Sequence, residues 1–479
     1  MFDERQGVIE LLEDALMRIR LAFGTTLMAY TMITLLSVAK SNAHTPVEPK
    51  STQTAPVNVD YDHIARGIVA DLVAKRYDKI TALYSPELAQ ALSAEKLATS
   101  WEGVVAQLGP FQSITSVEVE EAGGLHMVFV ACAFQRMNLT FRVGFNSEGQ
   151  FATFSSIPPD TASSWQAPDY AKPELFTERP FTVLSGHWSL PGMLSIPHGS
   201  GPYPAIVLVH GSGPNDMDES LGVNKMFKDL AWGLASRGIA VLRYTKRSHK
   251  YGAQGADDPN TFTLKDETID DARAAVAMLA AMPEINSKRI YIAGHSLGAY
   301  AGPRIASGDP QIAGLILMAG NTRPIADLIV EQTRYEVGLS GPITPAGQRA
   351  IDLAETSARE FTNPDLKPGM MVNFLGIPLP ASYVLDMRSY DQAEVAASLK
   401  IPILLLQGER DYNVSMVDFD GWKKALAGHR NATFRAYPAL DHFFLPGTGP
   451  SSPMQYMKPN HVELDVVEDI AGWVRGLGV

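Results

Sequence analysis

The sequence of 479 residues contains a single cysteine, Cys132. One cysteine excludes an intrachain disulfide scaffold, a zinc ribbon and a cysteine-ligated cluster. We interpret Cys132 as a small buried hydrophobic residue. Internal repeats with a period of about 20 to 50 residues are also lacking, which excludes solenoids and propellers.

Basic residues are in the minority, with 40 Lys and Arg against 52 Asp and Glu, a net charge of −12 and a pI near 5.4. This balance opposes broad attraction to phosphate backbones, so nucleic acid is not an expected partner. The content of 46% hydrophobic and 19% charged residues is that of an ordinary globular protein and excludes a disordered, collagenous or coiled-coil chain. At about 150 residues per domain, the length allows up to three units.

Long uncharged apolar runs are scarce, and the one that stands out spans residues 21–39. Arg18 and Arg20 precede it, and small residues up to Ala43 follow it. This layout is typical of a signal peptide, although the same length also suits an uncleaved membrane anchor. We therefore assign residues 1–43 to a signal peptide or N-terminal anchor and expect an exported protein, periplasmic or secreted.

A small domain is predicted next, after a linker at 44–58 that is rich in Pro, Thr, Ser and Val. Residues 59–156 change from helical spacing of apolar residues to alternating β-rich runs, which indicates an α+β domain. The expected helices lie within 64–73, 83–92 and 97–108, and the expected strands are 113–120, 126–134, 138–145 and 150–155. Because His, Asp and Glu do not cluster there at ligand spacing, we interpret it as a packing or binding module without chemistry.

A larger domain is predicted at 181–479, after a second linker at 157–180 that contains five prolines. The expected strands are the short apolar runs 205–209, 240–244, 289–293, 314–318, 401–406 and 433–437. Helical stretches such as 225–236 and 268–281 alternate with them. Runs that are apolar throughout suit strands buried on both faces, so we predict an α/β fold with a doubly wound, mostly parallel sheet.

One interval breaks this alternation, because residues 321–400 separate two consecutive strands. That is too long for a simple crossover, and we predict a mostly helical cap inserted there. Its apolar residues either line a substrate pocket or pack the cap itself. They include Met370, Met371, Phe374, Leu375 and Tyr383.

The strand at 289–293 runs directly into Gly294-His-Ser-Leu-Gly298 and then into a helical stretch. Two glycines in a strand–turn–helix allow a tight turn that strains the serine backbone and exposes its hydroxyl at a helix N-terminus. We therefore predict Ser296 as a nucleophile, the plain alternative being a serine that caps the helix.

A serine nucleophile needs a base, and the base needs an acid that orients it. Asp411 follows the strand at 401–406, and His442 follows the strand at 433–437, in the chain order expected on such a sheet. We predict Asp411 as the acid and His442 as the base. The rivals are Glu409, Asp418 and Asp420 for the acid, and His295, His249, His429 and His461 for the base.

The oxyanion of an acyl-transfer transition state needs preorganised donors. The strand at 205–209 leads into the glycine-rich loop His210-Gly-Ser-Gly-Pro214. We predict the amide of Leu297, next to the nucleophile, as one donor, and that of Ser212 or Gly213 as the second.

These motifs resemble the α/β-hydrolase superfamily over residues 180–479. The more specific motifs are Val241-Leu-Arg-Tyr244, Ala319-Gly-Asn-Thr-Arg-Pro324, Leu406-Gln-Gly-Glu-Arg-Asp411 and Asp420-Gly-Trp-Lys-Lys424. They resemble bacterial exported esterases of the dienelactone-hydrolase-like and prolyl-oligopeptidase-like group, many of which carry a small DUF3887 domain similar to residues 60–156. Such relatives often have Asp where this chain has Thr245, a departure from the pattern.

The resemblance implies a serine carboxylesterase that acts on a small-molecule ester without a metal or organic cofactor. A serine peptidase, a thioesterase and an acyltransferase would use the same groups, and a non-catalytic binding protein on a hydrolase scaffold is the alternative from another class. The size of the cap predicts a preference for short acyl chains of about two to six carbons. The sequence does not indicate an oligomeric state.

Overall fold

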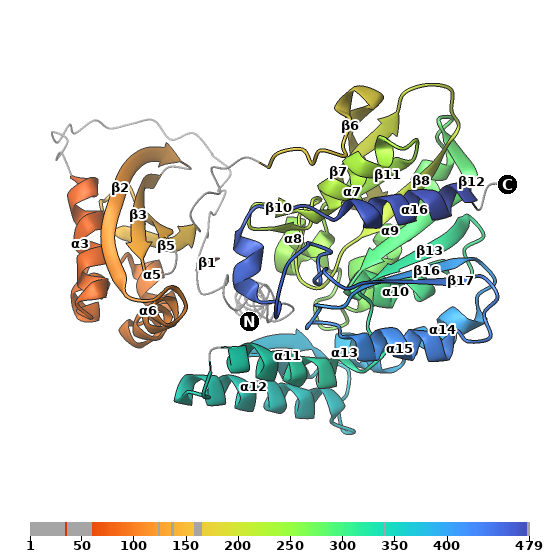
Figure 1. Cartoon of the computed structure of the whole chain (residues 1–479). Helices are drawn as coiled ribbons and strands as arrows, with labels where there is room; N and C mark the ends of the chain where they lie inside the picture. Colours follow the sequence, from red (N-terminus) through yellow and green to blue (C-terminus); the bar gives the residue numbers. More distant parts are fainter. Residues whose placement is uncertain are drawn as a thin grey trace, which may run out of the picture. The chain divides into compact units, whose positions relative to one another are not determined.

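The computed structural model describes residues 34–35, 60–122, 125–135, 138–157, 165–339 and 341–476 (Figure 1). They belong to two compact units: a small unit whose last described residue is Ile157, and a large unit that begins at Trp165. The predicted leader at 1–43 and linker at 44–58 lie outside the described residues, except for the two-residue strand β1 (Thr34–Leu35). None of the described helices has the length and apolar character needed to cross a membrane.

The small unit is an antiparallel sheet covered by helices. Its helices are α3 (Tyr61–Val73), α4 (Tyr77–Thr81), α5 (Pro86–Ala91) and α6 (Ala94–Leu108), and its longer strands are β2 (Phe111–Ala122), β3 (Leu125–Phe134), β4 (Asn138–Phe145) and β5 (Phe151–Ile157). The sheet order is β1-β5-β4-β3-β2. Ser85 and Ser93 start α5 and α6 because their hydroxyls accept backbone N–H groups of the first turn.

Aromatic residues join the helices of the small unit to its sheet. Trp101 on α6 packs against Phe134 and Phe141 on the strands. Cys132 lies in the same core and is fully buried, and burial raises the pKa of its thiol to about 12. The interpretation of Cys132 as a small buried hydrophobic residue is therefore confirmed.

The large unit is built on an eight-stranded sheet in the order β17-β16-β13-β12-β8-β11-β7-β6. Its strands are β6 (Phe176–Ser185), β7 (Trp188–Pro197), β8 (Tyr203–Val209), β11 (Ala240–Tyr244), β12 (Ile285–His295), β13 (Ile312–Met318), β16 (Ile403–Gly408) and β17 (Ala432–Tyr437). The six strands from β8 onward pair in parallel, and β6 and β7 form an antiparallel edge. The predicted α/β fold with a mostly parallel sheet is confirmed.

Helices bury both faces of this sheet. On one face, α9 (Asp270–Ala280) and α10 (Leu297–Ala306) pack in one apolar core, and on the other, α7 (Met226–Ala235) and α16 (Leu464–Gly476) pack in a second. Strand β8 shows why its sequence is apolar throughout: Val207 belongs to the first core and its neighbour Leu208 to the second. The parallel strands all end at the edge that carries the candidate catalytic residues.

The large unit begins inside the range that we expected to be a linker. Trp165 packs against Trp232 and donates a hydrogen bond to Asp229, and strand β6 already starts at Phe176. Pro180 lies within β6, which is tolerated because β6 is the outermost strand of the sheet and proline needs no inward hydrogen-bond donor there. The structure therefore shows ordered chain over much of the second half of 157–180.

The predicted cap contains helices and a short hairpin. Within 321–339 and 341–400, its elements are α11 (Ile325–Leu339), α12 (Pro345–Thr362), β14 (Met371–Phe374), β15 (Ile377–Pro380), α13 (Ala381–Arg388) and α14 (Gln392–Ser398). Helix α14 packs against α10 and is an ordinary crossover helix. The side-chain amide of Gln392 donates to the carbonyl of Asn321 at 3.0 Å, so the excursion proper covers residues 322–391.

Other short elements complete the large unit. They are η2 (Pro173–Leu175), β9 (Ser220–Leu221), β10 (Asn224–Lys225), α8 (Arg247–Tyr251), η3 (Gly252–Gly255), η4 (Lys265–Ile269), α15 (Met416–Ala425) and η5 (Pro453–Met457).

Candidate active site

Ser296 occupies a strained turn between β12 and α10. Its φ of +52° lies in the left-handed region, which residues other than glycine seldom adopt. Its backbone N–H donates to the carbonyl of Met318 on the neighbouring strand at 2.9 Å, which ties the turn to the sheet. The nucleophile predicted from the sequence thus stands at the carboxyl edge of the sheet.

The flanking glycines are required by close backbone approach. A Cβ on Gly294 would lie 2.2 Å from the carbonyl oxygen of Gly298, and a Cβ on Gly298 would lie 2.1 Å from that of Val209. No side chain fits at such distances, so only glycine lets α10 start this close to β8.

Asp411 and His442 meet at the adjacent strand ends. Nδ1 of His442 and Oδ2 of Asp411 are 2.7 Å apart, and both side chains are almost fully buried. A carboxylate can only accept, so Nδ1 carries a proton, and in the neutral imidazole Nε2 is left as the acceptor. This is the tautomer that a base for serine requires.

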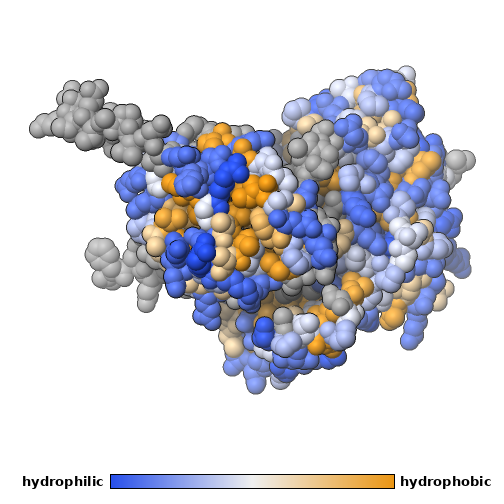
Figure 2. All heavy atoms as spheres, turned by 60° about the vertical axis from the view of Figure 1, so that its left-hand side comes forward, coloured by the Kyte–Doolittle hydropathy of each residue, from blue (hydrophilic) through white to orange (hydrophobic). Residues whose placement is uncertain are grey.

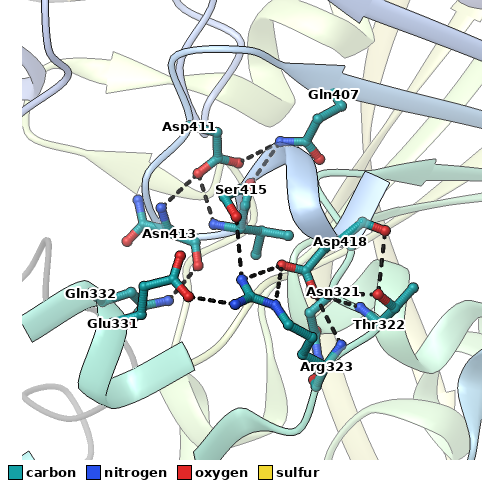
Figure 3. A network of polar contacts seen from close by, with 12 residues as sticks. Asn321, Thr322, Arg323, Glu331, Gln332, Gln407, Asp411, Asn413, Ser415 and Asp418 are labelled. Carbon is teal, nitrogen blue, oxygen red and sulfur yellow. Dashed lines mark hydrogen bonds and ion pairs between the residues drawn. The ribbon is translucent and has the colours of Figure 1, made fainter. Parts of the chain in front are cut away.

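The carboxylate of Asp411 is held by further donors (Figure 3). Its Oδ1 accepts the backbone N–H groups of Asn413 and Val414 at 2.8 and 2.9 Å, and its Oδ2 accepts the side-chain amide of Gln407 at 3.0 Å. Helix α11 of the cap reaches the same loop, because the amide of Gln332 donates to the carbonyl of Asn413 at 2.6 Å. The orientation of the acid is therefore fixed by its own loop, and the cap contacts that loop directly.

The rival acids are exposed or otherwise engaged. Glu409 and Asp420 are exposed, whereas Asp418 is fully buried and binds the guanidinium of Arg323 and the backbone N–H of Thr322 (Figure 3).

The rival histidines bind other groups. His249 is close to the carbonyl of Pro214, His429 to the carbonyl of Leu399, His461 to Asp229, and His295 to Glu219 and the backbone of His442.

In the glycine-rich loop after β8, side-chain donors hold the backbone carbonyls of Gly211 and Ser212. The amide of Asn215 donates to the carbonyls of Gly211 and Ser212 at 3.2 and 3.1 Å, and Nζ of Lys246 donates to that of Gly211 at 2.9 Å. In a trans peptide the N–H points opposite to the C=O, so the amides of Ser212 and Gly213 face away from Asn215. This arrangement suits donors for an oxyanion.

The sequence-based reasoning missed Lys246 and its partners. Lys246 is 2% exposed and lies 3.4 Å from Oε2 of Glu267, which also accepts the hydroxyl of Tyr383 from the cap at 2.8 Å. Lys246 follows the Arg243-Tyr-Thr motif noted in the sequence, which was the available signal, but its target carbonyl lies 35 residues away.

One cavity of about 130 Å³ joins these groups. It is lined by Ser296, Leu297, Ser212, Gly213 and His442, together with polar and apolar side chains. Its apolar lining comprises Leu221, Ile325, Leu328, Ile329, Phe374, Met387, Val414 and Phe443. The predicted site residues thus gather around one space, with Asp411 behind His442.

Among the five apolar cap residues considered from the sequence, Phe374 lines this cavity. Leu375 and Tyr383 are buried outside the lining, and Met370 and Met371 are 43% and 44% exposed. The cap instead contributes mainly helix α11, whose apolar residues at helical spacing face the cavity.

Two protein families match parts of the chain. Residues 206–456 match the alpha/beta hydrolase family, and residues 65–154 match a protein family of unknown function, DUF3887. Esterase EstD from Thermotoga maritima is 35% identical over 416 residues, which cover 86% of this chain and 95% of that protein.

Solved structures also resemble the chain. Est1E from Butyrivibrio proteoclasticus has 17% identity and a TM-score of 0.40, over 62% of this chain and 98% of that one. The esterase domain of a Rhodothermus marinus protein has 16% identity and a TM-score of 0.39, over 63% and 98%. With a family match over half of its length and a relative that it covers almost completely, the chain belongs to the alpha/beta hydrolase family.

Proposed function

We propose that this hydrolase cleaves carboxylic esters through a Ser296–His442–Asp411 triad and an acyl-enzyme intermediate. The observation that carries the proposal is the 2.7 Å contact between His442 and Asp411 beside a cavity that Ser296 also lines. The 35% identity to an esterase supports esters as the substrate class over peptides, thioesters or acyl transfer, which would use the same groups.

In the proposed reaction, Ser296 Oγ attacks the ester carbonyl carbon while its proton passes to Nε2 of His442. Asp411 stabilises the imidazolium that forms, and the amides of Leu297 and of the loop after β8 bind the oxyanion. His442 then protonates the departing alcohol and leaves an acyl-serine. Water attacks the acyl-serine by the same route, its proton passing through His442 back to Ser296, and the acid is released.

The first experiment is a panel of nitrophenyl acyl esters and peptide nitroanilides, run on the protein and on Ser296→Ala. We expect ester cleavage to fall more than about a thousandfold in Ser296→Ala and in His442→Ala, because a triad acts as a unit. Asp411→Asn is expected to be severe as well. A serine-directed phosphonate should label Ser296 stoichiometrically, and retention of more than about a tenth of the rate by Ser296→Ala would remove it from the mechanism.

We also propose a preference for short acyl chains, of about two to six carbons. A cavity of about 150 Å³ holds one benzene molecule, so a space of about 130 Å³ suits a small acyl group. The cap offers no single broad apolar surface among its described residues: Leu339 and Ile343 are exposed near the start of α12, and Met370 and Met371 near its other end. Figure 2 shows one face of the molecule, on which apolar residues gather in patches between hydrophilic ones.

The chain-length test is a series of nitrophenyl esters compared by kcat/KM. Each methylene that is buried adds about 0.8 kcal/mol until the cavity is full, after which overpacking reverses the trend. A maximum at about ten or more carbons would contradict the short-chain preference, as would faster cleavage of peptide amides than of any ester.

We propose that the protein is exported, on the basis of the uncharged run at 21–39 and its basic flank. Cell fractionation should find it outside the cytoplasm, with an N-terminus near Lys40 or His44 if the leader is cleaved. An intact N-terminus in the membrane fraction would indicate an anchor, and a full-length cytosolic product would contradict export.

A further inference from the structure

Glu219 and His295 form a buried charged pair beside the nucleophile that the reaction scheme does not use. Nδ1 of His295 is 3.1 Å from Oε1 of Glu219, and the two side chains are 2% and 5% exposed. A Cβ built on Gly211 would lie 2.9 Å from that oxygen and 3.2 Å from Cβ of Ser296, so the carboxylate sits close to the nucleophile.

The carboxylate of Glu219 also holds the glycine-rich loop. Its Oε1 accepts the backbone N–H of Gly211 at 2.6 Å. Glu219 adopts a φ of +46° in this placement, a region that costs a residue with a side chain about 1 kcal/mol or more. A left-handed backbone at a residue with a side chain persists where the surrounding contacts hold that side chain in a single position.

His295 reaches the catalytic base from the other side. Its Nε2 is 2.9 Å from the backbone carbonyl of His442, and the two imidazole rings are 4.7 Å apart. Both neighbours of the His295 ring, a carboxylate and a carbonyl, are acceptors. An imidazolium at His295 satisfies both contacts, because it donates from both ring nitrogens.

The charges around His295 agree with this protonation state. Burial alone would lower the pKa of His295, but the carboxylate of Glu219 outweighs it and the pKa is raised, with a further contribution from Asp411. Burial likewise opposes ionisation of Glu219, and its pKa is nevertheless lowered by His295 and His210. The ring of Phe443, which also packs beside the ring of His295, carries no charge.

We propose that Glu219 and the His295 imidazolium act as one positioning unit that holds the oxyanion loop and the backbone of His442 in register around Ser296. The proposal rests on the esterase mechanism above. Oε1 of Glu219 holds the loop by accepting the N–H of Gly211. The His295 ring, charged by Glu219, holds the backbone carbonyl of His442. Neither residue exchanges a proton with the substrate, and both act through the groups they hold.

Glu219→Gln and His295→Asn separate the two halves of the unit. In Glu219→Gln the side-chain amide oxygen can still accept from Gly211, but it no longer charges His295. A neutral His295 carries one ring proton, so it can no longer donate both to residue 219 and to the carbonyl of His442. Since the unit holds groups that act in the transition state, each single variant should lower kcat by about 10- to 100-fold with KM changed by less than about threefold. The double variant should be no worse than the worse single one.

Each rate is divided by the concentration of active sites, which is titrated with a serine-directed phosphonate. A variant that yields less folded protein then does not show a falsely lowered kcat. Asp271→Asn is the matched control, because it breaks the buried Arg247–Asp271 pair, which lies outside the cavity lining. It should lower stability while kcat per titrated site stays within about twofold.

Unchanged kcat in Glu219→Gln, with Ser296→Ala inactive, would overturn the positioning unit alone, as would a double variant whose loss equals the product of the single losses. Retained activity in Ser296→Ala would overturn the proposed function together with the unit.

If His295→Asn fails to fold, ¹⁵N-histidine spectra of the wild-type protein at pH 7 test the proposal instead. One imidazole protonated on both nitrogens, and lost in Glu219→Gln, supports the unit, and its absence overturns it.

Discussion

Asp441 stands next to His442 in the chain and is an unusual carboxylic acid. Burial, only partly offset by two backbone N–H groups from Phe443 and Leu445, raises its pKa to about 7. A raised pKa means that the folded state binds this proton more tightly than the unfolded state does. The resulting stabilisation is complete below about pH 4 and is lost as the pH rises toward 7.

Asp441→Asn should therefore flatten the pH dependence of stability. The amide oxygen of Asn keeps both backbone hydrogen bonds and has no proton to lose. The wild-type free energy of unfolding should fall relative to the variant by up to about 1.4 kcal/mol per pH unit between pH 4 and 7, and the variant should be the more stable at pH 8. Urea midpoints at pH 5 and pH 8 measure this, and an equal pH slope in both proteins would refute it.

The residues of the candidate site could be located from the sequence where the signal is local. Ser296 lies in a pentapeptide whose glycines report the turn, and Asp411 and His442 each follow a recognisable strand. Glu219 gave no such signal, because its position depends on a left-handed backbone and on His295, 76 residues away. Contacts of that kind are set by how loops fold over the sheet edge, and neither spacing nor periodicity encodes them.

The turn between β12 and α10 sets a strict limit on substitution at the element scale. Gly298→Ala would place a methyl group 2.1 Å from the carbonyl oxygen of Val209, which belongs to a central strand and cannot move away cheaply. We expect a loss of stability on the order of 3 kcal/mol together with loss of esterase activity. Thermal and urea unfolding measure the first, and nitrophenyl ester turnover the second.

Gly472 is the matched control for that substitution. It lies in helix α16, and a Cβ built there has no atom within 4 Å. Gly472→Ala should stabilise the protein by about 0.5–1 kcal/mol, because alanine favours helix. Equal effects at positions 298 and 472 would show that the close approach of α10 and β8 is not what selects glycine.

Arg323 ties the start of the cap to helix α15, which follows strand β16 (Figure 3). Arg323 binds the fully buried carboxylate of Asp418 at 2.8 Å and also contacts Glu331 on α11. Arg323→Met leaves that carboxylate with the backbone N–H groups of residues 322 and 323 and the hydroxyl of Thr322 as its donors. Because Arg323 is one-quarter exposed, we expect a loss of about 2–3 kcal/mol, less than for a fully buried pair.

Lys423→Met serves as the control for the arginine, since its ion pair with Asp420 is exposed on both sides. It should change the free energy of unfolding by less than about 0.5 kcal/mol. Similar losses in the two variants would mean that the anchoring of the cap does not depend on the buried carboxylate.

Some helices and strands were easier to predict from the sequence than others, because their amino-acid composition differs. The central strands are apolar throughout and bounded by helices, so their class and order could be inferred. Strands β6 and β7 were not anticipated, because prolines such as Pro180 resemble linker sequence, and the tolerance of an edge strand for proline appears only once the sheet is assembled. The hairpin β14–β15 was missed because each strand has only four residues.

At the scale of the whole molecule, the candidate site lies in the large unit. Every residue that lines the cavity lies between Gly211 and Phe443. A chain that begins at Trp165 should therefore cleave a short nitrophenyl ester with kcat/KM within about threefold of the full chain, because a domain with its own core folds independently. A loss of more than about tenfold, in protein that titrates fully with phosphonate, would assign the small unit a part in catalysis.

The excursion between Asn321 and Gln392 begins and ends at two residues that one hydrogen bond joins. The residues between those positions can thus be treated as a cassette whose two ends are already joined. Lengthening or shortening such a cassette adds little closure entropy. Descendants of this enzyme can consequently change what enters the cavity by exchanging one contiguous segment, because Ser296, Asp411 and His442 all lie outside it.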